Sequence, residues 1–420
     1  MSAPLALFVT RHSPRPREDG SGAYLHEMVS FLAAHGVRCH FAWLDQPEDV
    51  ARAWRWLPPP ELASVCHLHF RRSVRLGPAH WFPERLPIGG GLATRLGARF
   101  RPEPPHARRP VPFAGIPAGV ARWFRPLEVG ELAFVARLVR RLRPTALIAN
   151  YPWLGGAFAV AGPAARIVLT HNVWHQKAIS TAALGEPGRL AHLTPATEAA
   201  MLGAADHVVA ISEDDCAAFA KLVPAERVLF VPKAVAPRSA PGPEDPDLCL
   251  CLGSANPANR AGLDWLLAEV WPLVRRDHPA ARLRLCGRAG EGLAALPPGV
   301  ENLGYVEHPE SHYGAAALAL VPLRHGGGVK IKLLEALAFG KPVVTTSIGL
   351  QGLGFLVAST PPADTAEAFA AQIVGLLRDP AARATRAAES RRLALERFSL
   401  ERCYRPLLTA IAGPAVHAAC

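Results

Sequence analysis

The sequence has no long apolar run, although half of its 420 residues are hydrophobic. No stretch reaches the ~18–20 apolar residues that a membrane-spanning helix needs. The first apolar segment, Leu5 to Val9, is too short for a signal peptide and follows no charged segment, so it predicts a buried first strand. With this composition, the length predicts a globular chain of two or three domains.

Metal-binding and dinucleotide-binding patterns are absent as well. The eight cysteines are scattered without a CxxC pair, which predicts a reduced, cytoplasmic protein. No GxGxxG follows the first strand, and this absence disfavours an NAD enzyme. Asp214-Asp215 begins a predicted helix and Asp245-Pro246-Asp247 lies in a proline-rich linker, so neither acidic pair is placed to hold a metal ion. We therefore expect neither a metal nor a cofactor.

Lysine is rare in this chain, which has 40 arginines and only 6 lysines, and three of the six lie between residues 330 and 341. They belong to the stretch VPLRHGGGVKIKLLEALAFGKPVVTTSIG, residues 321–349, which predicts a strand end, a glycine turn, a helix and a second strand. Gly326, Gly327 and Gly328 allow the backbone to approach a ligand closely. Lys330 and Lys332 lie in the first turn of the predicted helix.

The start of this helix is a candidate anion site. A helix N-terminus attracts anions and the helix dipole disfavours cations there, so two lysines in the first turn indicate an anionic ligand. Glu335 comes three residues after Lys332 and shares its helix face, where it can contact the same extended ligand. The alternative is a glycine-rich turn that leads into an ordinary solvated helix.

The rest of the chain predicts an α/β fold in which strands alternate with helices. Residues 5–10 predict a strand, residues 11–22 a loop that contains Gly20 and Gly22, and residues 23–34 a helix, as at the start of a doubly wound domain. His171 follows a strand predicted for residues 166–170, and α/β folds place site residues at such strand ends. The alternative for His171 is a structural histidine bonded to the backbone.

A proline-rich linker divides the chain. Pro237 to Pro246 contains four prolines, a glycine and few apolar residues, which is typical of a domain boundary. We expect a first domain at residues 1–236 and a second at residues 247–398. A last helix, at about 399–412, is expected to pack back on the first domain. Residues 58–126 mix prolines, arginines and aromatics, and they allow no assignment of elements.

The net charge of +11 is concentrated in the first third of the chain. Residues 1–143 hold 21 arginines and 11 acidic residues, a balance of +10, whereas the rest holds 25 basic and 24 acidic residues, a balance of +1. An anionic membrane is a candidate partner because arginines alternate there with aromatics such as Trp81, Phe82 and Trp123. The alternative is a solvated arginine-rich surface. Nucleic acid is disfavoured because no basic recognition helix or RNA-reading aromatic motif is present.

Two motifs resemble one enzyme family. Residues 335–344 form the pattern E-A-x-A-x-G-x-P-V-V, and Glu198 with residues 205–212 forms E…A-D-x-V-V-A-I-S. Both resemble the retaining glycosyltransferases of family four, the group-one type with the GT-B fold. The resemblance implies two Rossmann-like domains that face each other across a cleft, with a nucleoside-diphosphate sugar bound to the second domain.

The resemblance also implies roles for named residues. Glu335 binds the ribose of the donor, while the glycine loop with Lys330 and Lys332 binds its diphosphate. His171 contacts the donor sugar. No metal is implied in this site.

Other positions match the family less closely. Arg260 lies near the position of a phosphate-binding lysine, whereas Ser254 stands where the family usually has an arginine. The family often has a glutamate eight residues before Glu335, and this chain has Gly327 there. The loop with Gly20 and Gly22 corresponds to one that faces the cleft and helps to place acceptor and donor.

The implied activity is transfer of a sugar, with retention of configuration, to a glycan or lipid-linked glycan in surface polysaccharide synthesis. The protein is then expected in the cytoplasm or at the inner face of the membrane. The alternatives are a non-catalytic nucleotide-binding module of the same fold and a nucleic-acid-binding protein that uses the basic first part.

Overall fold

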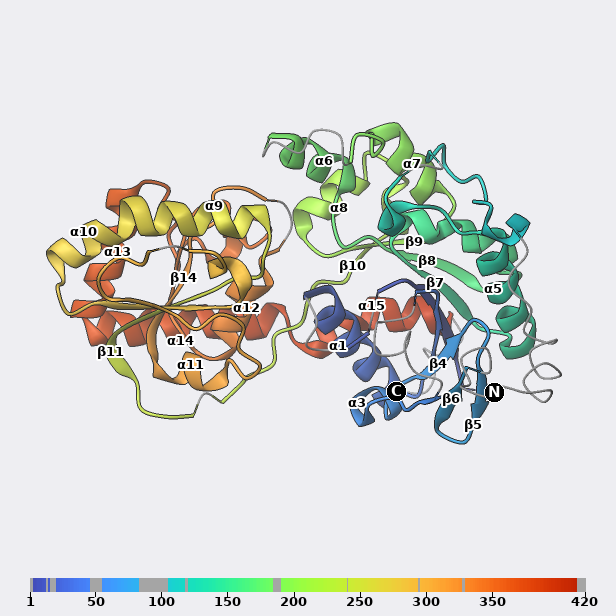
Figure 1. Cartoon of the computed structure of the whole chain (residues 1–420), viewed down its shortest axis with the longest axis horizontal. Coiled ribbons are helices and arrows are strands. Elements are labelled where there is room, and N and C mark those ends of the chain that lie inside the picture. The colour runs from blue at the N-terminus through green and yellow to red at the C-terminus, as the bar shows by residue number, and fades with distance from the viewer. Residues whose placement is uncertain are drawn as a thin grey trace, which may run out of the picture.

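The strands of this chain form two separate parallel sheets, and Figure 1 shows the two corresponding lobes. A computed structural model describes residues 3–12, 14–15, 20–45, 55–82, 105–117, 120–183, 190–239, 241–293, 295–326 and 329–413. Each sheet alternates with helices along the chain, so the predicted α/β fold with two Rossmann-like units is confirmed.

The first sheet has seven strands in the order β10-β9-β8-β7-β1-β2-β4, and all of its neighbours pair in parallel. Its central strands are buried on both faces, which explains why they read as continuous apolar runs. The strands are β1 (Leu5–Thr10), β2 (Arg38–Trp43), β4 (His67–Phe70), β7 (Ala146–Asn150), β8 (Ala165–Leu169), β9 (His207–Ala210) and β10 (Val228–Phe230).

Helices cover both faces of this sheet. They include α1 (Gly20–Ala34), α5 (Val129–Leu142), α6 (Trp174–Ala183), α7 (Pro195–Gly203) and α8 (Glu213–Phe219), with the short α3 (Pro60–Ala63) and the 3-10 segment η5 (Pro152–Val160). Ser212 caps α8, since its Oγ accepts a hydrogen bond of 2.9 Å from the Asp215 N–H.

The start of α1 corrects one prediction. Gly20 and Gly22 were expected in a loop, but α1 begins at Gly20 and both glycines lie in its first turn. The buried Tyr24, Leu25 and Met28 anchor the following turns in the core. Tertiary packing of this face therefore outweighs the low helix propensity of the two glycines.

The second sheet has five parallel strands in the order β13-β12-β11-β14-β15. Its strands are β11 (Asp245–Leu252), β12 (Arg282–Cys286), β13 (Val300–Asn302), β14 (Ala316–Val321) and β15 (Val343–Thr345). Its helices are α9 (Pro257–Trp265), the π-helical η7 (Leu266–Val270), α10 (Trp271–Asp277), α11 (Glu310–Ala315), α12 (Ile331–Ala338), α13 (Ala366–Arg378) and α14 (Pro380–Arg397).

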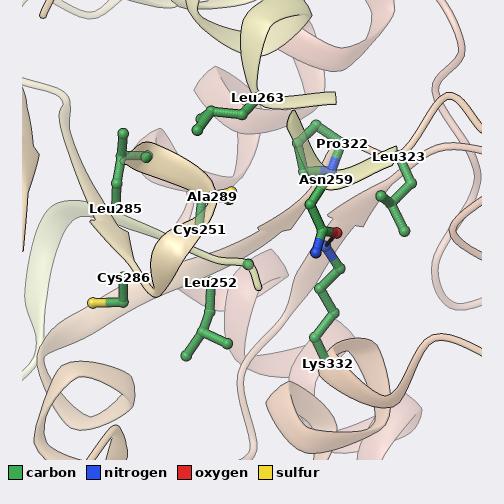
Figure 2. Close-up of a pocket in the computed structure, with 12 residues that line it drawn as sticks. Cys251, Leu252, Asn259, Leu263, Leu285, Cys286, Ala289, Pro322, Leu323 and Lys332 are labelled. Atoms are coloured by element: carbon green, nitrogen blue, oxygen red, sulfur yellow. Dashed lines mark hydrogen bonds between the residues drawn. The ribbon is translucent and has the colours of Figure 1, made fainter. Parts of the chain in front are cut away.

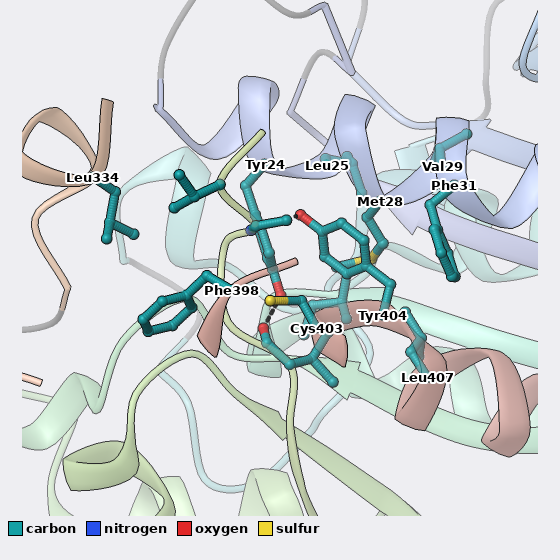
Figure 3. Close-up of a cluster of buried hydrophobic side chains, with 14 of the residues drawn as sticks. Tyr24, Leu25, Met28, Val29, Phe31, Leu334, Phe398, Cys403, Tyr404 and Leu407 are labelled. Carbon is teal, nitrogen blue, oxygen red and sulfur yellow. Dashed lines mark hydrogen bonds between the residues drawn. The ribbon is translucent and has the colours of Figure 1, made fainter. Parts of the chain in front are cut away.

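The last helix, α15 (Leu400–Ala412), lies in the lobe of the first sheet (Figure 1). Figure 3 shows Cys403, Tyr404 and Leu407 of this helix beside α1. The Tyr404 hydroxyl donates a hydrogen bond of 2.5 Å to Glu27 Oε1. The chain thus crosses between the lobes twice, once before β11 and once between α14 and α15.

Residues 58–126, for which the sequence allowed no assignment of elements, and the residues just before them form short strands and turns. They are a small antiparallel sheet of β3 (Arg55–Trp56), β6 (Ala79–Trp81) and β5 (Val74–Leu76), and the 3-10 turns η3 (Pro105–Arg108) and η4 (Arg122–Phe124). Phe82 is fully buried and Phe124 packs edge-on against Trp153, whereas Trp123 is 46% exposed. Phe82 is therefore not available to a membrane, and Phe124 is partly buried against the core of the first lobe.

The described segments contain neither a membrane-spanning helix nor a cluster of metal-binding side chains. None of their helices is both long enough and apolar enough to cross a membrane. They also contain no group of three or more His, Cys, Asp or Glu side chains placed to hold a metal ion.

Candidate functional site

The glycine loop between β14 and α12 brings the chain to the start of α12. Gly326 has a φ of +120°, which a residue with a Cβ rarely adopts. A Cβ built at Gly326 would lie 3.9 Å from Lys330 Nζ, so the ammonium of Lys330 sits against the loop. Gly327 and Gly328 lie outside the described residues. No side chain of the described residues caps α12, so its first N–H groups are available to a ligand.

Lys330 lies immediately before α12 and is buried. Its pKa is lowered to about 8, first by burial and then by the charge of Lys332; Lys177 lowers it further, whereas Asp215 opposes these effects. Two of the other five lysines thus act on Lys330 at this point. An anion placed among them would relieve this repulsion.

Two of these charges come from the first lobe. Lys177 belongs to α6 and Asp215 to α8, whereas Lys330 belongs to the second lobe. The N-terminus of α8 also touches the second lobe, because a Cβ built at Gly352 would lie only 2.9 Å from Ser212 Cβ. The candidate anion site therefore lies where the two lobes meet. Sequence reasoning missed Lys177, and only the scarcity of lysine offered a signal for it.

Lys332, two residues further, forms a hydrogen bond with a residue that sequence reasoning also missed. Its Nζ donates a hydrogen bond of 2.6 Å to Asn259 Oδ1 of α9, and Figure 2 shows the two side chains meeting. Burial lowers the pKa of Lys332. The pair lines a cavity of about 10 Å³, which is at most large enough for one water molecule, so a nucleotide has to bind outside it.

Arg260 does not join this group. Its Nε contacts Asp264 Oδ1 at 2.9 Å and one terminal nitrogen donates to the Glu291 carbonyl at 2.9 Å. Helix α9 begins at Pro257, three residues before Arg260, and Asn256 caps it. Because successive residues of a helix are rotated by about 100°, the face that meets Lys332 carries Asn259 and not Arg260. The predicted donor-binding role of Arg260 finds no support in this geometry.

Glu335 lines a large open groove between the lobes. The groove has a volume of about 1590 Å³. Its lining includes Glu27 of α1, Lys233 just after β10 and Ser254 just after β11. The Glu335 carboxyl is one-quarter exposed, and burial raises its pKa. Arg238 of the linker, another residue that sequence reasoning missed, approaches Glu335 Oε1 at 3.4 Å.

Two glycines allow the backbone segments at the floor of this groove to pack closely against each other. Gly287 follows β12 and has a φ of +88°. A Cβ on Gly287 would collide with the carbonyl of Gly253, and a Cβ on Gly253 would lie 2.9 Å from Ala289 Cβ. Both glycines line the groove or the small cavity beside Lys332. The ends of β11 and β12 are therefore packed closely beneath the space that a ligand would occupy.

His171 lies two residues beyond β8, as the strand pattern indicated, and it is 6% exposed. Its φ of +61° is unusual for a residue with a side chain. The ring stacks on Tyr151 with centroids 4.4 Å apart, and Nε2 lies 2.6 Å from Asn150 Oδ1. Burial, reinforced by the charges of His12 and Lys177, lowers the pKa of His171 to about 3. The imidazole is therefore neutral at physiological pH.

Comparison with known proteins relates the second lobe to a known family. Residues 246–379 match the family model of the group 1 glycosyl transferases, so the predicted group-one resemblance is confirmed for this segment. A Klebsiella pneumoniae protein described as an uncharacterised 44.6 kDa protein in the cps region is 30% identical over 109 residues. That alignment covers 23% of this chain and 28% of the relative, so the chain matches little more than a quarter of the relative's length.

Solved structures resemble the whole chain. TarM of S. aureus, in a complex with Fondaparinux, alpha-GlcNAc-glycerol and UDP, has a TM-score of 0.64 at 11% identity and covers 98% of this chain and 100% of its own. HepE of Anabaena in complex with UDP has a TM-score of 0.62 at 13% identity, with coverages of 97% and 99%. Sucrose-phosphate synthase of Thermosynechococcus elongatus has a TM-score of 0.65 at 19% identity, with coverages of 96% and 97%. At such low sequence identities, the structural similarity establishes the GT-B fold but no activity or substrate.

Proposed function

We propose that this chain, whose second lobe is of the group 1 glycosyl transferase type, transfers a sugar from a nucleoside-diphosphate sugar to an acceptor. The observation that carries this proposal is that the charges of Lys177 and Lys332 act on the buried Lys330 at the start of α12, while Glu335 of the same helix lines the groove. A diphosphate among the lysines would place its ribose toward Glu335, whose carboxylate can accept two hydroxyl hydrogen bonds. TarM and HepE, which share the fold, were solved with UDP.

The proposed chemistry needs stabilisation of a leaving group. The bond between the sugar C1 and the phosphate oxygen breaks, and its electron pair stays on the nucleoside diphosphate. Lysines and N–H groups already aimed at that oxygen stabilise the developing charge, and one such donor contributes about 3–4 kcal/mol in other enzymes. We propose that no metal takes part. We also propose that the acceptor oxygen attacks C1 on the face that the diphosphate leaves, which retains the configuration.

The proposed acceptor is a glycan or a lipid-linked glycan of surface polysaccharide synthesis. The relative encoded in a cps region of Klebsiella pneumoniae supports this assignment. TarM was solved with Fondaparinux and alpha-GlcNAc-glycerol, so its fold accommodates saccharides besides UDP. The groove between the lobes offers room for both substrates.

A thermal-shift screen of UDP, GDP and ADP tests the donor class. A nucleoside diphosphate at 100 times its dissociation constant should add about 2.7 kcal/mol to the free energy of unfolding. The matching nucleoside without phosphate should add much less, because it has no negative charge to place among the lysines. If none of the three diphosphates raises the melting temperature, the proposed donor site is wrong.

The affinity for the nucleoside diphosphate should also depend on pH, and the direction of the change follows from Lys330. The pKa of free Lys330 is about 8, and a bound diphosphate favours the charged form and raises it. Affinity should therefore be constant below pH 7 and fall as the pH rises above 8, by at most about tenfold per pH unit.

We also propose a peripheral contact with anionic membrane, but through other residues than the aromatics first considered. Arg38, Arg75 and Arg141 surround His67 and His69 at the β2–β4 edge of the first sheet, and this group is called the basic edge below. Arg75 and Arg141 approach the Nδ1 atoms of His67 and His69 at 3.2 and 3.3 Å. The charges of Arg75 and Arg38 lower the pKa of His67, and the charge of Arg141 lowers that of His69, after the larger effect of burial in each case.

Vesicle flotation tests this contact. Replacing Arg75 and Arg141 by serine should weaken binding to anionic vesicles by about 30-fold, because each basic residue near such a surface contributes about 1 kcal/mol. The control replaces Arg276 and Arg392, two exposed arginines of α10 and α14, by serine and should bind like wild type. Equal recovery of the wild type on neutral and anionic vesicles would contradict the proposal.

A further inference from the structure

Three buried polar residues meet at the ends of three neighbouring strands. Thr10 ends β1, Asn150 ends β7 and His171 follows β8, and the sheet order places these strands side by side. Asn150 Nδ2 donates to Thr10 Oγ1 at 2.9 Å, and His171 Nε2 lies 2.6 Å from Asn150 Oδ1. Asn150 is only 1% exposed, so its amide finds its partners within this network.

The direction of each hydrogen bond in the network follows from Thr10. Its hydroxyl donates to the His12 carbonyl at 3.0 Å and accepts from the His12 N–H at 2.9 Å. The single hydroxyl proton is therefore used, and Thr10 Oγ1 can only accept from the Asn150 amide. If the Asn150 amide were reversed, its oxygen would face Thr10 and would need the hydroxyl proton. The His12 carbonyl would then lose its hydrogen bond from Thr10. The amide oxygen of Asn150 consequently faces His171 and accepts its Nε2–H.

We propose that Asn150 is a positioning residue that holds His171 in the Nε2–H tautomer, so that Nδ1 accepts a hydrogen bond from a hydroxyl of the donor sugar. The inference rests on the proposed function for the identity of the ligand, but the tautomer itself is a property of the protein alone. In a neutral imidazole one nitrogen donates and the other accepts, so fixing Nε2 as the donor makes Nδ1 the acceptor.

The surroundings of the ring support this arrangement. Nδ1 of His171 makes no hydrogen bond among the described residues, and it is not one of the buried polar atoms that lack a partner, so it reaches accessible space. Stacking on Tyr151 fixes the ring plane. Tyr151 itself has a φ of +98°, and two adjacent strained positions at one strand-end face are typical of functional sites.

A fixed acceptor at Nδ1 has a consequence for the donor. It favours a sugar that presents a hydroxyl proton and disfavours one that presents a carboxylate oxygen at the same place, because two acceptors repel each other. A neutral hexose donor therefore fits the proposed contact better than a uronic acid does.

The tautomer can be measured on the full chain without any ligand. Labelling with ¹⁵N-histidine and recording long-range ¹H–¹⁵N correlations separates protonated from unprotonated ring nitrogens, and His171→Gln identifies the signals of His171. The wild type should show an unprotonated Nδ1 and a protonated Nε2 that do not titrate between pH 5 and 8. A protonated Nδ1 in the wild type would overturn the inference, whatever the variants do.

Variants at Asn150 test its role. Asn150→Ala should give a mixture of tautomers, whereas Asn150→Asp should keep Nε2 protonated and raise the pKa of His171, because a carboxylate favours the imidazolium. Asn259→Ala, an asparagine change in the other lobe, should leave the His171 signals unchanged. Unchanged tautomer and pKa in Asn150→Ala would overturn the positioning role.

A binding measurement separates this inference from the proposed function. Asn150→Ala should bind UDP like wild type but bind UDP-glucose about tenfold more weakly, since only the sugar contact is disturbed. If the wild type binds no nucleoside diphosphate, the proposed function fails while the tautomer can still be as inferred. If UDP binding is intact and UDP-glucose binding is unaffected, the contact with the sugar hydroxyl is refuted.

Discussion

Replacing Glu335 by alanine is expected to weaken binding of a nucleoside diphosphate by about ten- to a hundredfold. Charge-assisted hydrogen bonds of the kind that its carboxylate can offer to ribose contribute roughly 1.5–3 kcal/mol each. A nucleoside monophosphate should lose affinity by the same factor, because the ribose is common to both ligands. Titration calorimetry of UDP and UMP against the wild type and Glu335→Ala measures both losses.

Arg238→Ala is the control for this experiment. Arg238 approaches Glu335 at 3.4 Å, but its side chain is 47% exposed, and such ion pairs contribute only about 0–1 kcal/mol. Removing Arg238 should therefore leave nucleotide affinity nearly unchanged. If Arg238→Ala weakens UDP as much as Glu335→Ala does, Glu335 acts through the linker and not on the ribose.

The second large effect is expected at His171. His171→Ala should lower the turnover of the donor by tenfold or more, while the affinity for the nucleoside diphosphate stays near the wild-type value. The reason is that His171 is proposed to contact only the sugar, whereas the proposed contacts of the nucleotide are the lysines around Lys330 and the carboxylate of Glu335. Release of nucleoside diphosphate from its sugar conjugate, followed together with calorimetry, measures both quantities.

The pH profile adds a test of the neutral imidazole. Because the pKa of His171 is lowered to about 3, the ring stays neutral from pH 5 to 8 and should add no step to the rate profile in this range. An acidic limb between pH 5 and 8 that disappears in His171→Ala would contradict this account. A rate unchanged by the substitution would make His171 a structural residue.

Local sequence signals predicted the elements that carry the candidate site. The apolar run before residue 322, the glycines and the helical spacing of Leu333, Leu334 and Leu337 encode β14, the loop and α12 without any distant contact. The end of α12 was equally local, since Gly340 has a φ of +69°. Lys330, Lys332 and Glu335 therefore follow one another in space as they do in the sequence, and their roles remain predictions.

Contacts between distant segments could not be predicted in the same way. Asn259 is 73 residues from Lys332, and Asn150 is 140 residues from Thr10. Such pairs depend on which strands become neighbours and on the residue at which a helix begins. The position of Arg260 away from Lys332 has the second cause, because α9 begins at Pro257 and turns Asn259 toward Lys332.

The aromatic residues of the region 58–126 show another limit of sequence reasoning. Arginine and aromatic side chains alternate there, and this pattern is as compatible with a packed segment as with a membrane face. The structure buries Phe82 and packs Phe124 against Trp153, while it places the guanidinium groups of Arg75 and Arg141 beside His67 and His69. Burial depends on tertiary contacts, which no local pattern of these residues specifies.

The central claim is that the start of α12 binds the diphosphate and Glu335 the ribose of one ligand. The most direct test titrates uridine, UMP and UDP against Lys332→Ala and Glu335→Ala side by side. Lys332→Ala should weaken UDP far more than uridine, because the ammonium contacts only phosphate, whereas Glu335→Ala should weaken all three ligands by a similar factor. If both variants bind UDP as tightly as the wild type does, the donor site lies elsewhere in the protein and the account is wrong.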